Sequence, residues 1–219
     1  MLTLRAILDK VKKELAKKEK TKEALYDDMR KVTNFSKQSI LRYHQNKLEE
    51  ARKLLEEAKE LILKLQKMAE ECPSIVYGGM FSAALQEYSE AAVFLTLAVE
   101  SRYVSPEELN VPSVDYVLGL ADVIGEYRRL ALDALRVGDA EKGDTCLRIM
   151  DEIYIELTAL DEAYMLVPGL RRKCDVARRI IEATRGDVTQ EVRRKSLEDY
   201  LKHFEQERRK QQKVHKNRE

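Results

Sequence analysis

Two acidic residues interrupt an otherwise uncharged, apolar segment. Between Ile75 and Val99 the only charged residues are Glu87 and Glu90, which stand three positions apart. In a helix this spacing places both carboxylates on one face. A helix that is apolar on nearly all sides is expected to be buried, and burying two carboxylates is costly unless their charge is compensated. The segment therefore indicates a site rather than a plain core helix.

A second acidic pair follows in the next apolar segment. Asp122 and Glu126 stand four positions apart, again on one helical face. If the two helices pack together, carboxylate oxygens from both converge, which suits a hard divalent cation such as magnesium or manganese. Such an ion can activate water and stabilise charge on a phosphate. The candidate catalytic and metal-binding residues are Glu87, Glu90, Asp122 and Glu126.

These acids also have a simpler interpretation. They could pair with basic residues of other helices, with Arg128 and Arg129 the nearest in sequence, or point to solvent. Di-iron chemistry is disfavoured, because di-iron bundles need a histidine three residues after a glutamate. No histidine of this chain has that spacing; they are His44, His203 and His215.

Composition excludes several other classes of function. The cysteines, Cys72, Cys146 and Cys174, form no CxxC pair, so no zinc motif is visible, and their odd number favours a reducing compartment, here the cytoplasm. The N-terminus becomes charged too early for a signal peptide, and the glutamates in the segment 75–99 argue against a membrane span. A net charge of +1 rules out binding of nucleic acid by bulk charge and requires a local basic patch.

Periodicity predicts an all-α fold, a bundle of about seven long helices. Residues 1–71 contain neither glycine nor proline and predict two helices that join near Gln45, with a break near Val32–Phe35 as the alternative. We expect the third and fourth helices to be antiparallel neighbours, with Asp115 stabilising the fourth through the helix dipole. The expected helices span residues 3–44, 47–71, 76–102, 113–138, 140–166, 168–186 and 188–219.

A basic patch on the first helix is the candidate surface for contacts with nucleic-acid phosphates. Its residues are Arg30, Lys31, Lys37, Arg42 and His44. Phosphate contacts from such residues give affinity without sequence choice. The alternative is a solvated charged face, the usual fate of lysine and arginine on long helices. Nearby aromatic side chains could stack on bases but are more often part of a core; they are Tyr26, Phe35 and Tyr43.

Three runs of residues resemble the translin/TRAX family. The run LQEYSEA at residues 85–91 resembles the QEYxEA motif of TRAX, and VDYVLGLADVIGE at 114–126 resembles its VDYLLGxADLxGE motif. The run SKQSI at 36–40, with His44 beyond it, is similar to the SKRxI segment of the family. The resemblance covers residues 20 to 187, and the two acidic motifs match in order and separation.

This resemblance implies a helical domain over residues 1–187, followed by a helical extension with a basic tail over 188–219. It implies assembly into a hollow, usually eight-membered barrel, here expected as a homo-oligomer, most simply an octamer. TRAX carries a magnesium-dependent endoribonuclease site whose acids match Glu87, Glu90 and Asp122, with Glu126 as the fourth member. The expected partner is RNA, either single-stranded or duplex. No association with a membrane is expected.

Two competing functions stay open at this point. A non-catalytic protein that binds single-stranded nucleic acid, like translin alone, would lack the full acidic set. An all-helical nucleotide pyrophosphohydrolase of the MazG kind also uses ExxE with a second acidic pair and magnesium. Its second motif is shorter than the DxxxE of Asp122 and Glu126, and the surrounding VDYxLGxAD run argues against it.

Overall fold

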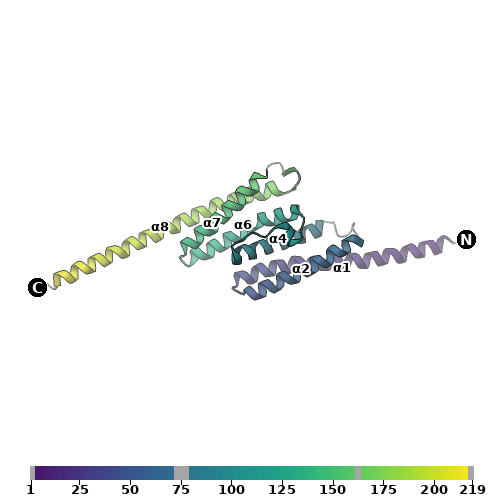
Figure 1. The fold of residues 1–219 in the computed structure, drawn as a ribbon, viewed down its shortest axis with the longest axis horizontal. Helices are drawn as coiled ribbons and strands as arrows, with labels where there is room; N and C mark the ends of the chain where they lie inside the picture. The colour runs from purple at the N-terminus through teal and green to yellow at the C-terminus, as the bar shows by residue number, and fades with distance from the viewer. Residues whose placement is uncertain (1–2, 72–78, 161–163, 217–219) are drawn as a thin grey trace. The chain divides into compact units, whose positions relative to one another are not determined.

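The computed structural model describes residues 3–71, 79–160 and 164–216, and over these ranges it contains helices and no strand (Figure 1). The all-α prediction is thereby confirmed. The helices are α1 (Leu4–His44), α2 (Leu48–Glu71), α4 (Gly79–Glu100), α5 (Pro106–Leu109), α6 (Ser113–Arg136), α7 (Ala140–Ala159) and α8 (Leu170–Lys216). No described helix is both long enough and apolar enough to cross a membrane.

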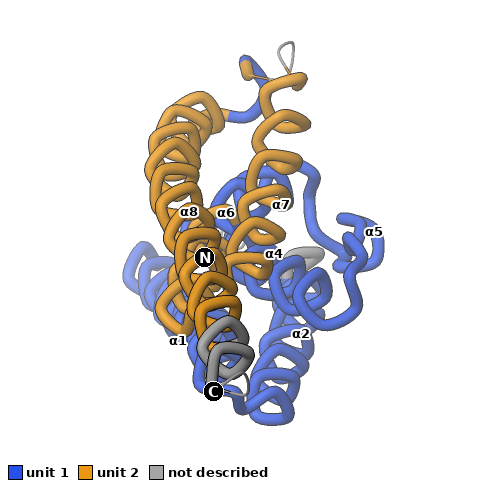
Figure 2. Tube along the Cα trace, turned by 90° about the vertical axis from the view of Figure 1, so that its left-hand side faces the viewer, with its two compact units in different colours: residues 1–123, 165–167 blue, residues 124–164, 168–219 orange. Residues whose placement is uncertain are grey.

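The chain divides into two compact units, which Figure 2 distinguishes by colour. Unit 1 comprises residues 1–123 and 165–167, and unit 2 comprises residues 124–164 and 168–219. The boundary falls within α6, so that Asp122 belongs to unit 1 and Glu126 to unit 2.

In unit 1, α1 packs against both α2 and α4. The Thr3 side chain caps the start of α1, and Gln45 with Asn46, whose φ is 60°, forms the turn into α2 as predicted. The helix runs unbroken through Val32–Phe35, because Val32 and Ser36 are fully buried there and packing holds the backbone. The alternative break in α1 is therefore wrong.

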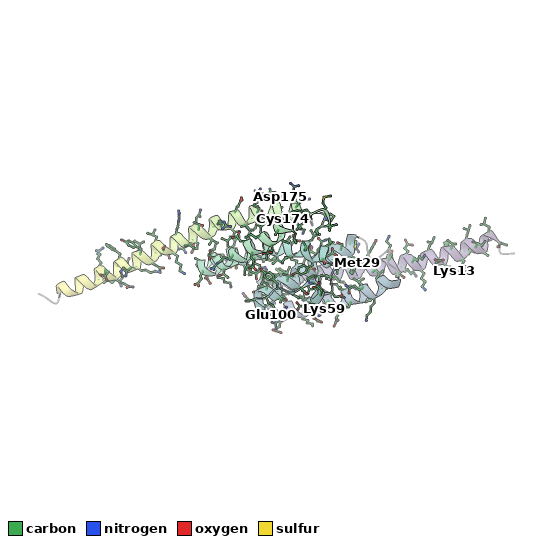
Figure 3. The ribbon with its side chains drawn as sticks, turned by 45° about the horizontal axis from the view of Figure 1, so that its top comes forward. Lys13, Met29, Lys59, Glu100, Cys174 and Asp175 are labelled. Atoms are coloured by element: carbon green, nitrogen blue, oxygen red, sulfur yellow. The ribbon has the colours of Figure 1, made fainter. Side chains whose placement is uncertain are left out.

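The first part of α1 differs from the rest of the helix in its exposure. Residues 4–20 are exposed throughout, whereas Leu25 and Met29 are buried. Figure 3 labels Lys13 on the exposed stretch and Met29 on the packed one. With 41 residues against 24, α1 is much longer than its neighbour α2.

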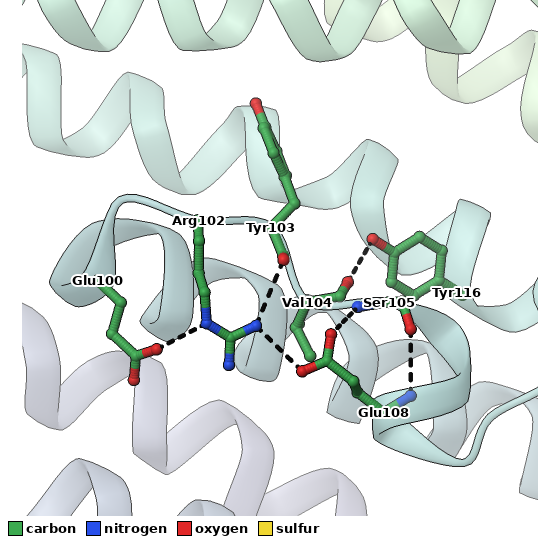
Figure 4. Close-up of polar contacts among 7 residues, drawn as sticks. All are labelled: Glu100, Arg102, Tyr103, Val104, Ser105, Glu108 and Tyr116. Carbon is green, nitrogen blue, oxygen red and sulfur yellow. Dashed lines mark hydrogen bonds and ion pairs between the residues drawn. The ribbon is translucent and has the colours of Figure 1, made fainter.

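The connection between α4 and α6 contains a short helix, α5, that the sequence reading missed. Ser105 and Glu108 form a capping box, and Pro106 occupies the first turn, two start signals that were visible in the sequence. Arg102 joins Glu100 at 2.9 Å to Glu108 at 3.0 Å, and Tyr116 donates a hydrogen bond to the Val104 carbonyl at 2.7 Å (Figure 4).

This connection corrects the expected direction of α6 relative to α4. Ser82 on α4 contacts Asp115, whereas Glu90, further along α4, contacts Gly119. Contacts advance along both helices together, so they run parallel rather than antiparallel. A helix advances about 1.5 Å per residue and an extended chain about 3.3 Å, so the segment 101–112 is long enough to return to the beginning of α4.

In unit 2, α7 and α8 pack as an antiparallel pair around a core that includes Cys146, Met150, Leu170 and Ile181. The helix α7 ends at Ala159 instead of Leu166. Met165 and Leu166, which belong to unit 1, are 90% and 75% exposed, so these two described residues gain little burial that could stabilise a longer helix. The segment 161–163 lies outside the described residues, as does the expected start of the third helix at Val76.

The two helices predicted on either side of Gly186 are a single helix, α8, of 47 residues. A glycine inside a helix costs about 1 kcal/mol relative to alanine, which packing can offset. Thr184 and Val188 flank Gly186 at a spacing that puts both on one face, and both are buried. Arg194 also pairs with Glu191 and Glu198 on the following turns. The predicted interruption at Gly186 is therefore wrong.

Candidate functional site

A close approach of two backbones brings the acidic helices together. A Cβ atom on Gly119 would lie 2.6 Å from the carbonyl oxygen of Gln86, 2.7 Å from Cβ of Ser89 and 2.9 Å from the backbone nitrogen of Glu90. Such distances exclude any side chain at position 119, and glycine is the residue that permits this approach. The contact places α6 directly against the turn of α4 that carries Glu90.

A buried polar cluster fixes the position of α6 along α4. Asp115 is only 6% exposed, and its carboxylate accepts a hydrogen bond from the hydroxyl of Ser82. Gln86 Nε2 donates to the same carboxylate oxygen at 3.4 Å and to Ser82 Oγ at 3.1 Å. Sequence reasoning gave Asp115 only a helix-dipole role, and no pattern in the sequence points to its partners Ser82 and Gln86.

Three of the predicted site acids lie on the two helices that meet in unit 1. Glu87 and Glu90 are partly buried on α4, and Asp122 is partly buried on α6, about one turn beyond Gly119. Because α4 and α6 run in the same direction, Asp122 follows the contact with Glu90 along the shared axis. The donors are hard carboxylate oxygens, which fit magnesium or manganese.

In the described residues, no three His, Cys, Asp or Glu side chains are already gathered around one metal position. The long side chains of Glu87 and Glu90 would have to rotate to share an ion with Asp122. For Glu87 the observed contact is a different one, with a basic residue from another helix. Lys37 Nζ on α1 lies 3.0 Å from Glu87 Oε1. The simpler interpretation, pairing with a base, is thus met at this residue.

The fourth predicted acid lies in unit 2. Glu126 is partly buried on α6, one turn after Asp122 and on the same helical face. Arg128, the suggested counter-ion, donates to the Ile180 carbonyl at 3.1 Å and to the Thr184 hydroxyl at 2.9 Å. Its guanidinium is therefore engaged by α8.

The residues proposed for RNA contact have separate partners. Arg30 pairs with Asp27 at 3.3 Å, and Arg42 pairs with Glu50 at 3.2 Å. His44 stacks on Phe94 at 5.3 Å, and Tyr43 meets the same ring edge-on at 5.1 Å. One ring face of His44 and the edge of Tyr43 thus contact the core residue Phe94, and both residues are only partly buried.

Lys31 takes part in a structural ion pair. Its ammonium lies 3.3 Å from Asp28, which also accepts from Lys64 on α2 at 2.7 Å. Burial opposes the charged form of Asp28, but the hydrogen bonds from Lys64 and Lys31 outweigh it and lower its pKa. Sequence reasoning missed Asp28, a buried carboxylate that ties α1 to α2.

Comparison with known proteins places this site in context. The model of the translin family matches residues 5–184. An uncharacterized protein of Methanocaldococcus jannaschii is 32% identical over 190 residues, covering 86% of this chain and 84% of that protein.

Solved structures agree with this match. The structure of AfC3PO in complex with duplex RNA has a TM-score of 0.74 and 34% identity, covering 84% of this chain and 95% of that one. Apo-NeC3PO gives a TM-score of 0.75 at 26% identity, covering 87% and 98% of the two chains.

Proposed function

This chain belongs to the translin family, and from that premise we propose that it is a metal-dependent endoribonuclease that cleaves RNA phosphodiester bonds inside an oligomeric shell. The observation that carries the proposal is the contact at Gly119. It supports a position of Asp122 close to Glu90, because Asp122 follows Gly119 by about one helical turn on α6. In this proposal the carboxylates of the two helices meet at one place once the side chains of Glu87 and Glu90 have rotated toward Asp122. The presence of this acidic set makes the chain TRAX-like in the proposal.

Glu87, Glu90 and Asp122 would hold magnesium or manganese, and Glu126 would complete or orient the set. When bound there, the ion supplies an activated water and stabilises negative charge on a phosphate. The residues of the chain position that chemistry: Asp115, Ser82 and Gln86 keep α6 in place along α4. Partial burial of the glutamates limits competing water around their oxygens.

RNA is the proposed substrate because AfC3PO, which shares this fold at 34% identity, has been solved with duplex RNA. Basic residues on α1 would contact phosphates; they are Arg30, Lys31, Lys37, Arg42 and His44. We propose assembly of identical chains, with an octamer as the expected form, and action in the cytoplasm.

The test compares Asp122→Asn and Glu90→Gln with controls on the same helices, Asp133→Asn and Glu100→Gln. Each site variant keeps the side-chain shape and removes a ligand charge, so RNA cleavage should fall by roughly a hundredfold or more. RNA affinity measured with EDTA should stay near wild type, because the basic residues of α1 carry it. The melting temperature should stay near wild type or rise, since fewer like charges lie near one another. The controls should cleave normally, because their acids pair with arginines away from the contact with Gly119.

Full cleavage activity in both site variants would contradict the assignment. Parallel incubation with nucleoside triphosphates tests the pyrophosphohydrolase alternative. RNA binding without any cleavage by the wild-type protein, with magnesium or manganese, would favour the non-catalytic binding protein.

A further inference from the structure

The ion pair between Lys37 and Glu87 links a proposed RNA-binding residue to a proposed metal ligand. Lys37 projects from α1 and Glu87 from α4, with Nζ and Oε1 3.0 Å apart. The lysine side chain is 59% exposed and the glutamate side chain 27%. Both belong to unit 1, so this contact is internal to one compact unit.

This pair differs from the other lysine pairs of unit 1 in its acidic partner. Lys31 and Lys64 meet Asp28, a carboxylate with 11% of its side chain exposed, and together they join α1 to α2. Other lysines of unit 1 pair with glutamates three or four positions away: Lys18 with Glu14, Lys47 with Glu50 and Lys53 with Glu57. Only in the pair of Lys37 does the carboxylate have a second proposed role, because Glu87 would also be needed by the metal.

We propose that Lys37 is an exchangeable counter-ion, which neutralises Glu87 in the metal-free protein and moves to an RNA phosphate when the metal binds. This inference rests on the proposed function. An ammonium and a divalent cation compete for the same carboxylate oxygens, so metal binding releases the lysine. The released ammonium stands at the rim of the site, where a phosphate of the substrate would arrive.

The physical chemistry of lysine suits this exchange. Its ammonium is a compact point charge on a flexible four-carbon stem, so it can change partners without movement of the helix. A pair this exposed contributes little to stability, so its loss leaves the fold intact. The structure is held by other contacts, since α1 is joined to α2 by Asp28 and by the hydrogen bond from Ser39 to the Ala51 carbonyl.

Exchange of this kind couples two binding events. Metal binding frees a cation for RNA, so metal raises RNA affinity, and by linkage RNA raises metal affinity to the same degree. A lysine that simply contacted RNA at all times would contribute equally with and without metal. The coupling therefore separates the proposal from a fixed contact.

The first experiment measures manganese binding by calorimetry in the absence of RNA. Lys37→Met removes the competing cation, so manganese should bind about two- to fivefold more tightly than in the wild type. Lys18→Met is the matched control, because its ammonium also lies 3.0 Å from a glutamate and its side chain is 65% exposed. Manganese affinity of the control should equal that of the wild type, and Lys37→Arg should stay close to the wild type because it keeps the charge.

The second experiment measures affinity for a short RNA oligonucleotide, once with EDTA and once with calcium, with integrity of the RNA checked on a gel. Lys37→Met should weaken binding with calcium and change it little with EDTA. With calcium, the dependence of log affinity on log salt should fall by about 0.7 to 0.9 relative to the wild type, the loss of one phosphate contact.

The outcomes distinguish this inference from the proposed function. If Glu90→Gln weakens manganese binding but Lys37→Met leaves it unchanged, the metal site stands and the exchange is overturned. Equal loss of RNA affinity with EDTA and with calcium would also overturn it. If neither Glu90→Gln nor Asp122→Asn affects manganese binding, the proposed function itself fails. Melting temperatures of all variants show that each protein is folded.

Discussion

Gly119 permits the close approach of α4 and α6. A Cβ atom at this position would lie under 3 Å from three atoms of α4, two of them backbone atoms that cannot rotate away. Gly125, later on the same helix, has no atom within 4 Å of its corresponding position. Close packing therefore explains the glycine at position 119. It does not explain the glycine at position 125.

Gly119→Ala should destabilise the protein by about 1–3 kcal/mol, because overpacking forces α6 away from α4. Manganese binding and RNA cleavage should fall with it, since Asp122 moves with α6. Urea unfolding measures the change in stability, calorimetry measures manganese binding, and an RNA cleavage assay measures the loss of activity. Gly125→Ala is the control and should stabilise the helix by about 0.5–1 kcal/mol. A Gly119→Ala protein with wild-type stability would contradict the close approach.

Cys146 illustrates how burial controls reactivity at the residue scale. Desolvation raises the pKa of its thiol to about 11, and the residue is 4% exposed. The thiolate is the reactive form, so iodoacetamide at mildly alkaline pH should modify Cys146 slowly in the native protein and rapidly in urea. Mass spectrometry of the alkylated peptides checks this. Equal rates in both conditions would show that the thiol is accessible in the folded chain.

At the scale of elements, the connection with α5 determines where α6 begins. Arg102, Glu108 and the capping box hold this segment against the end of α4, so that the chain returns before α6 starts (Figure 4). Glu100, Arg102 and Glu108 are half exposed, so they stabilise this segment through hydrogen bonds and ion pairs more than through burial. Protonation is therefore the condition that should loosen the segment.

The backbone N–H of Ser105, and then Arg102, hold the pKa of Glu108 below its ordinary value of 4.5. A depressed pKa in the folded state stabilises the fold above pH 4.5, and this contribution is lost as pH falls through the folded pKa. Glu108→Gln should therefore be less stable than wild type near neutral pH, and the difference should shrink in stronger acid. The urea midpoints of both proteins, measured near neutral pH and in stronger acid, test this prediction. A difference between the midpoints that stays constant with pH would contradict it.

The sequence predicted the elements better than their directions and joins. The two long helices α1 and α2 followed from the absence of glycine and proline in residues 1–71, and the join between them was predicted near Gln45. Both are local signals. The path of α6 depends on how the segment 101–112 folds back, which helical periodicity does not encode. Gly186 was read as an end because local propensity omits the buried contacts of Thr184 and Val188.

The site acids were found because charge is rare in α4 and in the first half of α6. The partner of Glu87 was not identified, because Lys37 lies fifty positions away and the pairing depends on how α1 crosses α4. The same holds for Asp115, whose partners Ser82 and Gln86 are polar residues without a distinctive pattern. A single sequence therefore did not predict tertiary contacts between polar residues that carry no recognisable motif.

At the scale of the whole molecule, the exposed start of α1 carries an apolar stripe. Its residues recur at intervals of four, three and four, the spacing of helices that pair side by side, and they are Leu4, Leu8, Val11 and Leu15. The same track continues into Leu25 and Met29, which are buried within unit 1. A second copy of the chain is the occupant we expect for the exposed part, consistent with the proposed homo-oligomer.

Light scattering at micromolar concentration should show an assembly, with an octamer as the expected form. The double variant Leu8→Ser and Val11→Ser should shift the protein toward smaller species, because it removes apolar area at the centre of the stripe. Leu63→Ser is the control, a substitution of an isolated residue with 41% exposure on α2. A stable wild-type monomer would contradict the assembly, and an unchanged mass in the double variant would exclude this stripe from it.

The order of the helices along the chain has a consequence for synthesis. The helices α1, α2 and α4 are complete at Glu100, whereas α6, with Asp122, is translated later. Chains fold from the N-terminus as they emerge from the ribosome, so Lys37 can neutralise Glu87 before α6 exists. The proposed centre is then assembled only after Asp122 has been made. Until that point, a nascent chain beside its messenger RNA lacks one acid of the proposed nuclease centre.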